Sequence, residues 1–364
     1  MHVSELDTPA LVVDLDVLDM NLREMAEYCR SHNLKLRPHI KTHKSPFIAR
    51  KQLDSGACGI TVAKLGEAEM MAQAGLDDIL VAYPVVGTAK LNRLVELARK
   101  VRLTVATDSL EVAQGVSEAA AAGEVTIRML AEMDAGLRRC GVQSAAELAA
   151  LSLEMARLSN VDFAGFMFFP GHVRVPPEQQ APLLQEIDAK LQEARELLER
   201  AGIQVREVSG GSTPTAYRTQ LMKNVTEIRP GTYVFNDVNT TMMGATDLAH
   251  CALTIHTTVV SHAVKGRAVV DAGSKTIASD PCIKKEHAGI GHVLDCPGVF
   301  LESMSEEHGH LNIEQAGRAL AIGDRLRIIP NHVCTAVNLH DEVWGVRNDE
   351  VVEHWRVEGR GLVR

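Results

Sequence analysis

A lysine that directly follows a short apolar run is the residue whose chemistry is most easily defined in this sequence. Lys41 comes after Leu34–Ile40, a run typical of a buried strand, within the segment RPHIKTHK of residues 37–44. Lysines are rarely buried without a partner or a function, because burial of an ammonium group is costly. A suitably placed amine can attack an aldehyde carbon as a Schiff-base nucleophile. Many lysines beside strands simply reach solvent, so Lys41 is a candidate nucleophile that needs support from other residues.

Two glycine-containing segments could bind an anion. Residues 209–213 read Ser-Gly-Gly-Ser-Thr, and residues 229–233 read Arg-Pro-Gly-Thr-Tyr. Glycine lets backbone amides approach a phosphate closely, and the neighbouring hydroxyl groups add donors. An ordinary turn can have the same composition. If the segments follow strands seven and eight of a barrel, however, they lie where barrels often bind phosphate.

A histidine and a cysteine separated by one residue could ligate a metal ion. His332 and Cys334 lie in residues 330–334, which we expect to be extended, so that both side chains project to the same side. Imidazole and thiolate are a zinc-type ligand pair, and two protein ligands would leave coordination positions open for water or substrate. A single His-x-Cys pair also occurs by chance. Three other histidines of this region can equally be surface or packed residues: His308, His310 and His340.

Short β-branched runs recur along the first two-thirds of the chain, each followed by a stretch with apolar residues at helical spacing. The expected strands are Lys35–Ile40, Gly59–Ala63, Asp78–Tyr83, Arg102–Thr107, Val125–Glu132, Asp162–Phe168, Val205–Val208 and Glu227–Phe235. The clearest expected helix is Leu183–Gly202. This alternation predicts an α/β protein with a (β/α)8 barrel. An open doubly wound sheet is the alternative, but no Gly-x-Gly-x-x-Gly follows a first strand.

A barrel would position its functional side chains at the C-terminal ends of the strands. The residues expected there are Lys41, Lys64, Tyr83, Asp108, Asp134, Phe169, Ser209 and Asn236. After about residue 245 the long helices cease, and runs such as Leu253–Val260, Arg267–Asp271 and Arg325–Ile329 predict a mostly antiparallel sheet. We therefore predict a barrel domain over residues 9–245 and a β-rich domain over residues 246–364 that carries the metal pair. Residues 1–8 could join the β-rich domain.

Composition excludes several classes of protein. The chain has 364 residues, of which 46% are hydrophobic and 23% charged, and its net charge of −9 argues against nucleic-acid binding. No apolar run is long enough to cross a membrane, and the first residues do not resemble a signal peptide. Seven widely spaced cysteines favour reduced thiols. We expect a cytoplasmic protein that binds neither nucleic acid nor membrane.

Together, these motifs resemble those of D-threonine aldolases and eukaryotic-type D-serine dehydratases, which are fold-type III pyridoxal 5'-phosphate enzymes with an alanine racemase-like barrel. The resemblance extends over almost the whole chain. It rests on residues 8–10 (Thr-Pro-Ala), 37–44, 134–141 (Asp-x-Gly-x-x-Arg-Cys-Gly), 209–213, 271–275 (Asp-Ala-Gly-Ser-Lys), and His332-x-Cys334 followed by residues 338–341 (Asn-Leu-His-Asp).

The resemblance implies roles for the candidate residues. Lys41 would carry pyridoxal phosphate covalently and act in catalysis, and Arg139 would contact the ring substituents. Arg229 would lie near the pyridine nitrogen, as in racemases. A further cofactor-binding role is implied for Ser209, Gly211, Ser212, Thr213, Gly231 and Thr232. The metal ligands fall on His332 and Cys334, for Mn²⁺, Zn²⁺ or Mg²⁺. His172, in the loop after the sixth expected strand, would be a catalytic base or part of the pocket wall.

The implied activity is that of a metal-dependent lyase acting on β-hydroxy-D-amino acids. We favour the D-threonine aldolase type, a carbon–carbon lyase that cleaves its substrate to glycine and an aldehyde. The alternative is a dehydratase of the D-serine or D-threo-3-hydroxyaspartate type, which gives a keto acid and ammonia. Cys334 departs from the His-x-Asp pattern with manganese that is typical of the aldolases, and a thiolate favours zinc.

A different class, a non-catalytic pyridoxal phosphate carrier, resembles the barrel alone, so the additional β-rich region with its metal-type pair argues against it. The same pair argues against alanine racemase itself. The family resemblance also implies a homodimer.

Overall fold

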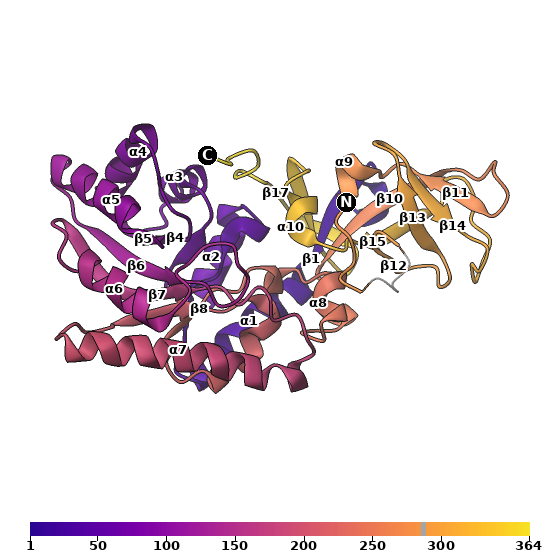
Figure 1. Ribbon diagram of the computed structural model, residues 1–364. Helices are drawn as coiled ribbons and strands as arrows, with labels where there is room; N and C mark the ends of the chain where they lie inside the picture. The colour runs from indigo at the N-terminus through magenta and orange to yellow at the C-terminus, as the bar shows by residue number, and fades with distance from the viewer. Residues whose placement is uncertain (285–288) are drawn as a thin grey trace. The chain divides into compact units, whose positions relative to one another are not determined.

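Two compact units make up the structure, a computed structural model that describes residues 1–284 and 289–364. One unit consists of residues 25–41, 48–231 and 362–364, and the other of residues 1–24, 42–47 and 232–361. The units are therefore interleaved along the chain, whereas the sequence predicts a barrel over residues 9–245 and a β-rich domain over residues 246–364 that residues 1–8 could join. Figure 1 shows the ribbon coloured along the chain, with the parallel strands and long helices in one unit and most antiparallel strands in the other.

The first of these units is built on an eight-stranded parallel sheet in the order β2-β9-β8-β7-β6-β5-β4-β3. Its strands are β2 (Lys35–Leu36), β3 (Ile60–Val62), β4 (Asp78–Val81), β5 (Arg102–Thr107), β6 (Ile127–Met133), β7 (Val161–Phe168), β8 (Glu207–Gly210) and β9 (Glu227–Ile228). The two edges of the sheet meet through a parallel bridge between His39 and Thr61, supported by the Thr61 N–H, which donates to the Pro38 carbonyl at 2.8 Å. The predicted alanine racemase-like barrel is thereby confirmed.

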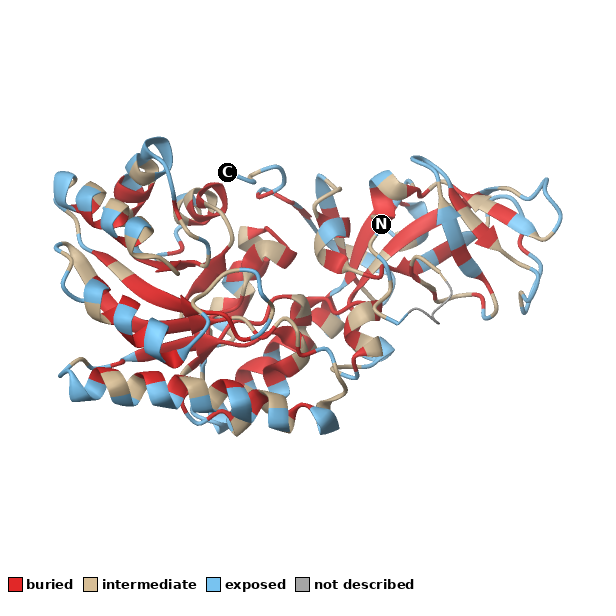
Figure 2. Ribbon diagram, in the orientation of Figure 1, coloured by how far each residue is buried: buried red, intermediate tan, exposed pale blue. Residues whose placement is uncertain are grey.

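Helices alternate with these strands as the periodicity predicts. They are α1 (Leu15–Ser31), α2 (Pro46–Asp54), α3 (Leu65–Gln73), α4 (Thr88–Ala98), α5 (Leu110–Ala122), α6 (Ala145–Met155), α7 (Ala181–Arg200) and the short α8 (Val238–Met242). The apolar face predicted for Leu183–Gly202 is buried in α7, as Figure 2 shows by its red stripe. Single-turn or short 3-10 helices lie between them: η1 (Val3–Glu5), η2 (Ile40–Thr42), η3 (Pro177–Gln179), η4 (Thr213–Leu221), η5 (Thr232–Val234) and η6 (Leu248–His250).

Two strands are shorter than predicted, and a proline interrupts each. The run Lys35–Ile40 is a strand only at β2, and its end forms the 3-10 turn η2 that contains Lys41. The run Glu227–Phe235 is a strand only at β9 and ends in η5. Pro38 and Pro230 have no N–H with which to continue a ladder of hydrogen bonds, so the regular strands end before these residues, although His39 still bridges to Thr61.

The second unit contains a nine-stranded, mostly antiparallel sheet. Its strands are β1 (Ala10–Asp14), β10 (Leu253–Ser261), β11 (Arg267–Val270), β12 (His292–Val293), β13 (Phe300–Met304), β14 (Gly309–Asn312), β15 (Arg325–Ile329), β16 (Glu342–Arg347) and β17 (Glu350–Arg356), with the short helices α9 (Ser274–Ile277) and α10 (Val333–Val337). Strand β1 pairs antiparallel with β10 and parallel with β16. The N-terminal strand therefore belongs to the same sheet as the C-terminal strands.

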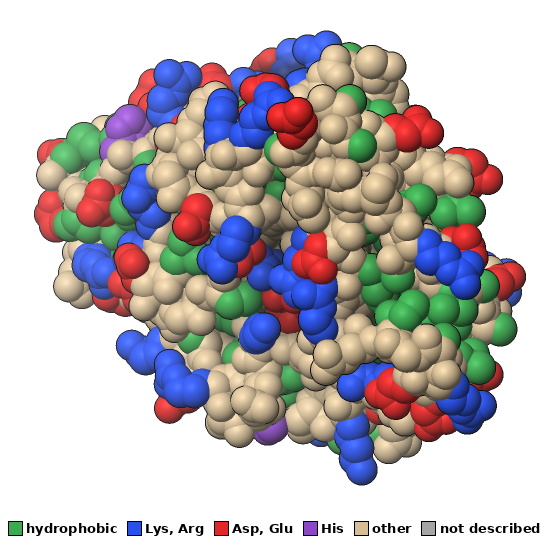
Figure 3. Space-filling view, turned by 90° about the vertical axis from the view of Figure 1, so that its left-hand side faces the viewer, with side chains coloured by type: hydrophobic (Ala, Val, Ile, Leu, Met, Phe, Trp, Pro, Cys, Tyr) green, Lys and Arg blue, Asp and Glu red, His purple; other side chains and the backbone are tan. Residues whose placement is uncertain are grey.

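The helices and one face of the surface can be compared with the features that membrane and nucleic-acid binding require. No helix in residues 1–284 or 289–364 has the length and apolar composition needed to cross a membrane. On the face drawn in Figure 3, acidic and basic side chains intermingle.

Candidate active site

Lys41 and Arg139 meet at an aromatic ring at the ends of the barrel strands. The Lys41 Nζ lies 5.8 Å from the centroid of the Phe169 ring, and the Arg139 Cζ lies 4.9 Å from the same centroid. Lys41 is half-buried in η2 after β2, Arg139 follows β6, and Phe169 follows β7. The structure thus brings together three residues that the sequence places at the ends of different strands.

The loop that carries Arg139 is fixed by backbone hydrogen bonds to carboxylates. Asp134 Oδ1 accepts from the N–H groups of Gly136 and Arg138, each at 3.0 Å. Burial alone would raise the pKa of Asp134, but these N–H groups hold it below its usual value. Asp108 Oδ2 accepts from the Gly141 N–H at 2.9 Å. Arg139 is therefore presented from a loop that is tied down on both sides.

His172 packs against this same loop. Gly136 has a φ of +124°, and a side chain at this position would meet the His172 ring at 2.9 Å. The His172 Nδ1 is buried and has no hydrogen-bond partner among the described residues. The predicted base or wall residue therefore lies beside the Arg139 loop with an unsatisfied ring nitrogen.

The predicted phosphate segment forms the start of η4. Gly211 has a φ of +96°, a left-handed conformation that favours glycine. Ser212 is the N-cap residue of η4, and its hydroxyl lies 3.0 Å from the Thr215 hydroxyl. Ser212 and Thr213 are buried. The N–H groups and positive dipole end of a helix attract anions, so these residues fit a phosphate group.

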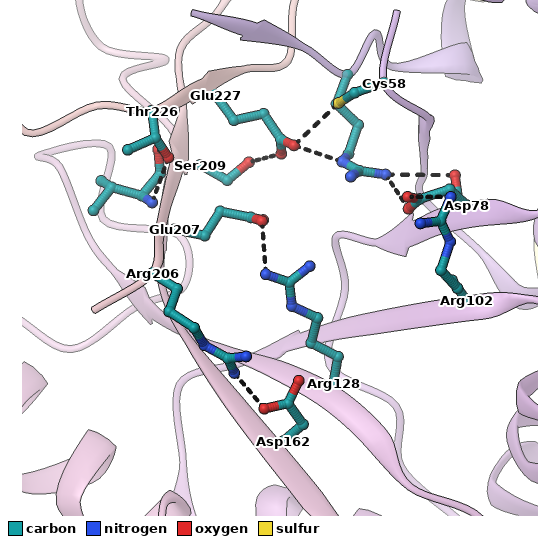
Figure 4. Close-up of polar contacts among 12 residues, drawn as sticks. Cys58, Asp78, Arg102, Arg128, Asp162, Arg206, Glu207, Ser209, Thr226 and Glu227 are labelled. Carbon is teal, nitrogen blue, oxygen red and sulfur yellow. Dashed lines mark hydrogen bonds and ion pairs between the residues drawn. The ribbon is translucent and has the colours of Figure 1, made fainter. Parts of the chain in front are cut away.

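Ser209 and Arg229 belong to a buried network inside the barrel. The Ser209 hydroxyl donates to Glu227 Oε1 at 2.6 Å and accepts from Arg229 Nη1 at 2.8 Å. Arg229 Nη2 donates to the Phe168 carbonyl at 2.9 Å. Figure 4 shows Ser209 and Glu227 in this network. Because a hydroxyl has one proton, Ser209 has none left for a phosphate oxygen while it donates to Glu227.

The network continues from Glu227 of β9 through Arg37 to Asp78 of β4. Arg37 Nε donates to Glu227 Oε2 at 2.8 Å, and Arg37 Nη1 donates to Asp78 Oδ1 at 2.6 Å. Burial opposes the charge on Arg37, but Glu227, Cys58 and Asp78 together outweigh this effect and raise the pKa of Arg37. Burial raises the pKa of the nearby Cys58 thiol to about 12, which makes this thiol a poor nucleophile.

Glu132 is a site residue that sequence reasoning missed. It lies at the end of β6 with 3% of its surface exposed. Burial raises the pKa of Glu132 to about 7, against the opposing effect of Arg229 and Arg139. Burial also lowers the pKa of Arg229 to about 10. In the sequence, Glu132 could have been identified as the one glutamate at the otherwise apolar end of the expected strand Val125–Glu132.

His332 and Cys334 do come together, but not through an extended segment. The expectation that residues 330–334 are extended is wrong: His332 is the N-cap residue of α10, and Cys334 lies in its first turn. Asp237 supports the start of α10 at this point, because its Oδ2 accepts from the Val333 N–H at 3.1 Å and lies 3.0 Å from His332 Nδ1. The His332 and Cys334 side chains are hydrogen-bonded to each other.

The pair also contacts two hydroxyl groups. Cys334 Sγ lies 3.2 Å from the hydroxyl of Thr42, the residue that follows Lys41, and 3.9 Å from that of Thr232. Thr232 begins η5, and the preceding Gly231 is buried. Burial disfavours the charged form of His332, but the Cys334 thiolate and the Asp237 carboxylate raise the pKa of this histidine to about 11.

The donor chemistry fits an open metal site. An imidazole backed by a carboxylate, together with a thiol, is a ligand set suited to zinc. Across the described ranges 1–284 and 289–364, no group of three or more His, Cys, Asp or Glu side chains is arranged to hold a metal. His308, His310 and His340 lie elsewhere: His310 is near Ser303 and Ser305, and His340 Nε2 lies 3.0 Å from the Thr276 carbonyl. A metal held here would therefore have two protein ligands from this chain.

Fold and side chains together define a class: a closed parallel barrel with a lysine after its first strand, and a mostly antiparallel sheet with a histidine–cysteine pair. Residues 13–238 match the alanine racemase N-terminal domain, and residues 252–346 match a putative serine dehydratase domain. The chain is 33% identical to the D-threonine aldolase of Arthrobacter sp., over 100% of this chain and 95% of the relative. It is also 33% identical to the D-threo-3-hydroxyaspartate dehydratase of Delftia sp. (strain HT23), over 96% of this chain and 97% of the relative.

Among solved structures, the crystal structure of D-threonine aldolase from Filomicrobium marinum has a TM-score of 0.92 at 33% identity, covering 99% of this chain and 97% of that chain. The protein belongs to the D-threonine aldolase and D-serine dehydratase family of fold-type III pyridoxal phosphate enzymes, as the sequence motifs predict. Its relatives include both aldolases and dehydratases.

Proposed function

We propose that the protein is a pyridoxal phosphate- and divalent metal-dependent lyase that acts on β-hydroxy-D-amino acids. The family and the site residues support this. Lys41 would hold the cofactor covalently, residues 211–213 would hold its phosphate, and Arg139 would face its ring. His332 and Cys334 would hold the metal ion. When bound, pyridoxal phosphate delocalises negative charge developing on the substrate, and the metal polarises the β-hydroxyl group.

The chain's own residues have separate tasks in this proposal. Lys41 accepts or donates a proton at its Nζ when it is not attached to the cofactor. His172, with its unpartnered ring nitrogen beside the Arg139 loop, is placed to take up a proton or to orient the substrate. Asp237 fixes one nitrogen of His332, which leaves the other ring nitrogen for a metal.

Of the two lyase outcomes, we propose dehydration to a keto acid and ammonia, and Cys334 is the observation that carries this choice. A thiolate ligand favours zinc over manganese. Solved structures of the Delftia dehydratase include a histidine-to-alanine mutant and a cysteine-to-alanine mutant in the metal-free form, and these two residues lie two positions apart in that protein. His332 and Cys334 have the same spacing.

Retro-aldol cleavage to glycine and an aldehyde, which the sequence analysis favours, is the second candidate. The Arthrobacter aldolase matches this chain along its whole length, and the family also contains 3-hydroxy-D-aspartate aldolase, 32% identical in Paracoccus denitrificans. Overall similarity therefore does not separate the two outcomes, and the proposal of dehydration is supported by the metal ligand Cys334 alone.

Product analysis tests the choice. The purified protein would be incubated with pyridoxal phosphate, D-threonine, and either zinc or manganese. We expect 2-oxobutanoate and ammonia, with higher activity in zinc. Acetaldehyde and glycine would instead establish the aldolase, with Cys334 as a variant ligand. If neither pair of products forms although the protein still binds the cofactor, the result would favour another β-hydroxy substrate or the carrier alternative.

The attachment of the cofactor has its own test. Lys41→Ala should abolish the visible absorbance band of the cofactor-loaded protein, because the amine that forms the covalent bond is gone. Lys35→Ala, which removes an exposed lysine of β2, is the matched control and should keep the band. A band that persists in Lys41→Ala would contradict the proposed function. A homodimer stays a prediction from the family resemblance, and a cytoplasmic location stays a prediction from composition.

A further inference from the structure

Glu132 projects into the interior of the barrel. In the same strand, β6, Arg128 Nη2 reaches Glu207 Oε2 of β8 at 3.0 Å, so Arg128 faces inward. Side chains two residues apart share a face of a strand. Leu130 accordingly packs with buried residues of other barrel strands, Leu80 of β4 and Ala106 of β5 among them. Glu132, the next residue on this face, must also point inward.

The strand register places Glu132 level with the polar network already described. Glu132 pairs with Met167 of β7, Met167 pairs with Ser209 of β8, and Ser209 pairs with Glu227 of β9. Ser209 is the residue whose hydroxyl accepts from Arg229. Glu132 is therefore in register with Ser209 and Glu227 of the network, and Arg229 follows Glu227 by two residues, at the strand ends.

The carboxyl group has no direct partner. Glu132 is buried, with 3% of the residue exposed. Among the described residues its side chain forms no hydrogen bond or ion pair, and its carboxyl oxygens keep a small accessible surface. Buried carboxyl groups are normally hydrogen-bonded. A carboxyl group that lacks a partner at the end of a barrel strand, where ligands bind, indicates that something else meets it when the site is filled.

Five ionisable groups influence Glu132, from three elements. Arg229, after β9, and Arg139, after β6, attract its negative charge, whereas Asp108, after β5, and Asp134 repel it. The thiol of Cys140 is also within its electrostatic reach. The two arginines are residues that the proposed function places at the cofactor ring, so the charge of Glu132 acts on both.

We propose that Glu132 is a positioning residue of the cofactor site: the negative charge of its carboxylate acts on Arg139 and Arg229 without direct contact and favours positive charge at the bond between Lys41 and the cofactor. This inference rests on the proposed function, because it requires that pyridoxal phosphate binds at Lys41.

The test is a pH titration of the visible absorbance band of the cofactor-loaded protein. Glu132→Gln keeps the shape of the side chain but removes the charge, so a positively charged lysine–cofactor bond loses a stabilising carboxylate. The midpoint of the titration should then fall by about one pH unit, a tenfold change in proton affinity. Glu132→Asp should restore most of the shift. Glu124→Gln, an exposed glutamate shortly before β6, should not move the midpoint.

A second readout uses the protein without cofactor and separates a folding defect from a loss of positioning. Burial raises the pKa of Glu132 in the folded state from 4.5 to about 7. The protonated form is therefore favoured by folding, and the stability of the wild type should fall as pH rises from 4.5 to 7 and stay constant above it. The glutamine side chain of the Glu132→Gln variant does not titrate. The melting temperature of this variant relative to the wild type should therefore rise between pH 4.5 and 7.

The outcomes are distinguishable. A lowered midpoint in Glu132→Gln with rescue in Glu132→Asp supports the inference. An unchanged midpoint in a folded, cofactor-loaded Glu132→Gln protein overturns it and leaves the proposed function intact. Absence of the visible band in the wild type overturns the proposed function, and this inference with it.

Discussion

Asp237 holds His332 through a set of contacts that a metal site requires. Its Oδ2 contacts both the His332 ring and the Val333 N–H, and its Oδ1 accepts from the Thr240 N–H at 2.8 Å. Asp237 itself is fully buried. A carboxylate that binds one ring nitrogen fixes the tautomer and orientation of a ligating histidine. Asp237 is thus the residue on which the geometry of the proposed metal site depends.

Asp237→Asn should weaken divalent metal binding by about 10- to 100-fold, the range seen when such supporting residues are changed. The amide cannot replace the carboxylate charge, although it preserves the shape. The measurement is the zinc dissociation constant from competition with a chromophoric chelator. Asp247→Asn is the matched control, because Asp247 also caps a helix, the 3-10 helix η6, and contacts a histidine, His250, at 2.7 Å. Equal affinities for the two variants would contradict the role of Asp237.

Single residues were predictable where their chemistry is visible along the chain. Lys41 follows a strand, and His332 and Cys334 are neighbours, so their types and spacing sufficed. Asp237 and His332 are 95 residues apart, and nothing in the sequence near Asp237 indicates its partner. Glu132 was missed for the same reason, because its importance depends on Arg229 from another strand.

The first residues of α6 and α5 show how a capping hydrogen bond can stabilise a helix. Ser144 begins α6, and its hydroxyl accepts from the Glu147 N–H at 3.2 Å, while the Glu147 carboxylate accepts from the Ser144 N–H at 3.1 Å. Ser109 begins α5, but its side chain makes no capping hydrogen bond. The two serines therefore occupy equivalent positions with and without a cap.

Ser144→Ala should lower the free energy of unfolding by about 1 kcal/mol, because the Glu147 N–H loses its acceptor. Ser109→Ala should change it by less than about 0.5 kcal/mol, since no capping bond is lost. Urea denaturation followed by far-UV circular dichroism would compare the two variants with the wild type. A cost for Ser109→Ala as large as that for Ser144→Ala would show that the serine hydroxyl is not what stabilises α6.

Elements were predicted well where periodicity is long and poorly where local contacts decide. Strand β5 and helix α7 follow from apolar patterning alone. Pro38 and Pro230 shorten two strands that β-branched composition would extend, and Asp237 turns an expected extended segment into α10. These changes arise from a missing N–H group or from a distant acceptor, which patterning does not detect.

At the scale of the whole chain, strand alternation predicts the barrel, but it does not identify which sheet receives the N-terminal strand. Strand β1 is buried along most of its length, as a barrel strand would be. Its partners β10 and β16 lie at the other end of the sequence. Pairing over such a separation is decided by tertiary packing, so the interleaved units could not be predicted from local pattern.

The Arg37 side chain, which follows β2, joins β9 and β4 across the place where the barrel closes. It pairs with Glu227 of β9 at 2.8 Å and with Asp78 of β4 at 2.6 Å. The Glu227 side chain is fully buried. Arg102 pairs with the same Asp78 at 3.3 Å, but 76% of its side chain is exposed. The two arginines therefore offer a buried and an exposed ion pair to one carboxylate.

Arg37→Met should lower the free energy of unfolding of the barrel by about 3 to 5 kcal/mol, because it leaves the Glu227 charge buried without its main partner. Arg102→Met should cost less than about 1 kcal/mol, since water already screens that pair. Far-UV circular dichroism in urea would follow the barrel. Both tryptophans, Trp344 and Trp355, lie in the other compact unit, so their fluorescence reports on that unit separately. If the two variants were equally stable, the buried network would not be what closes the barrel, and backbone pairing between His39 and Thr61 would have to suffice.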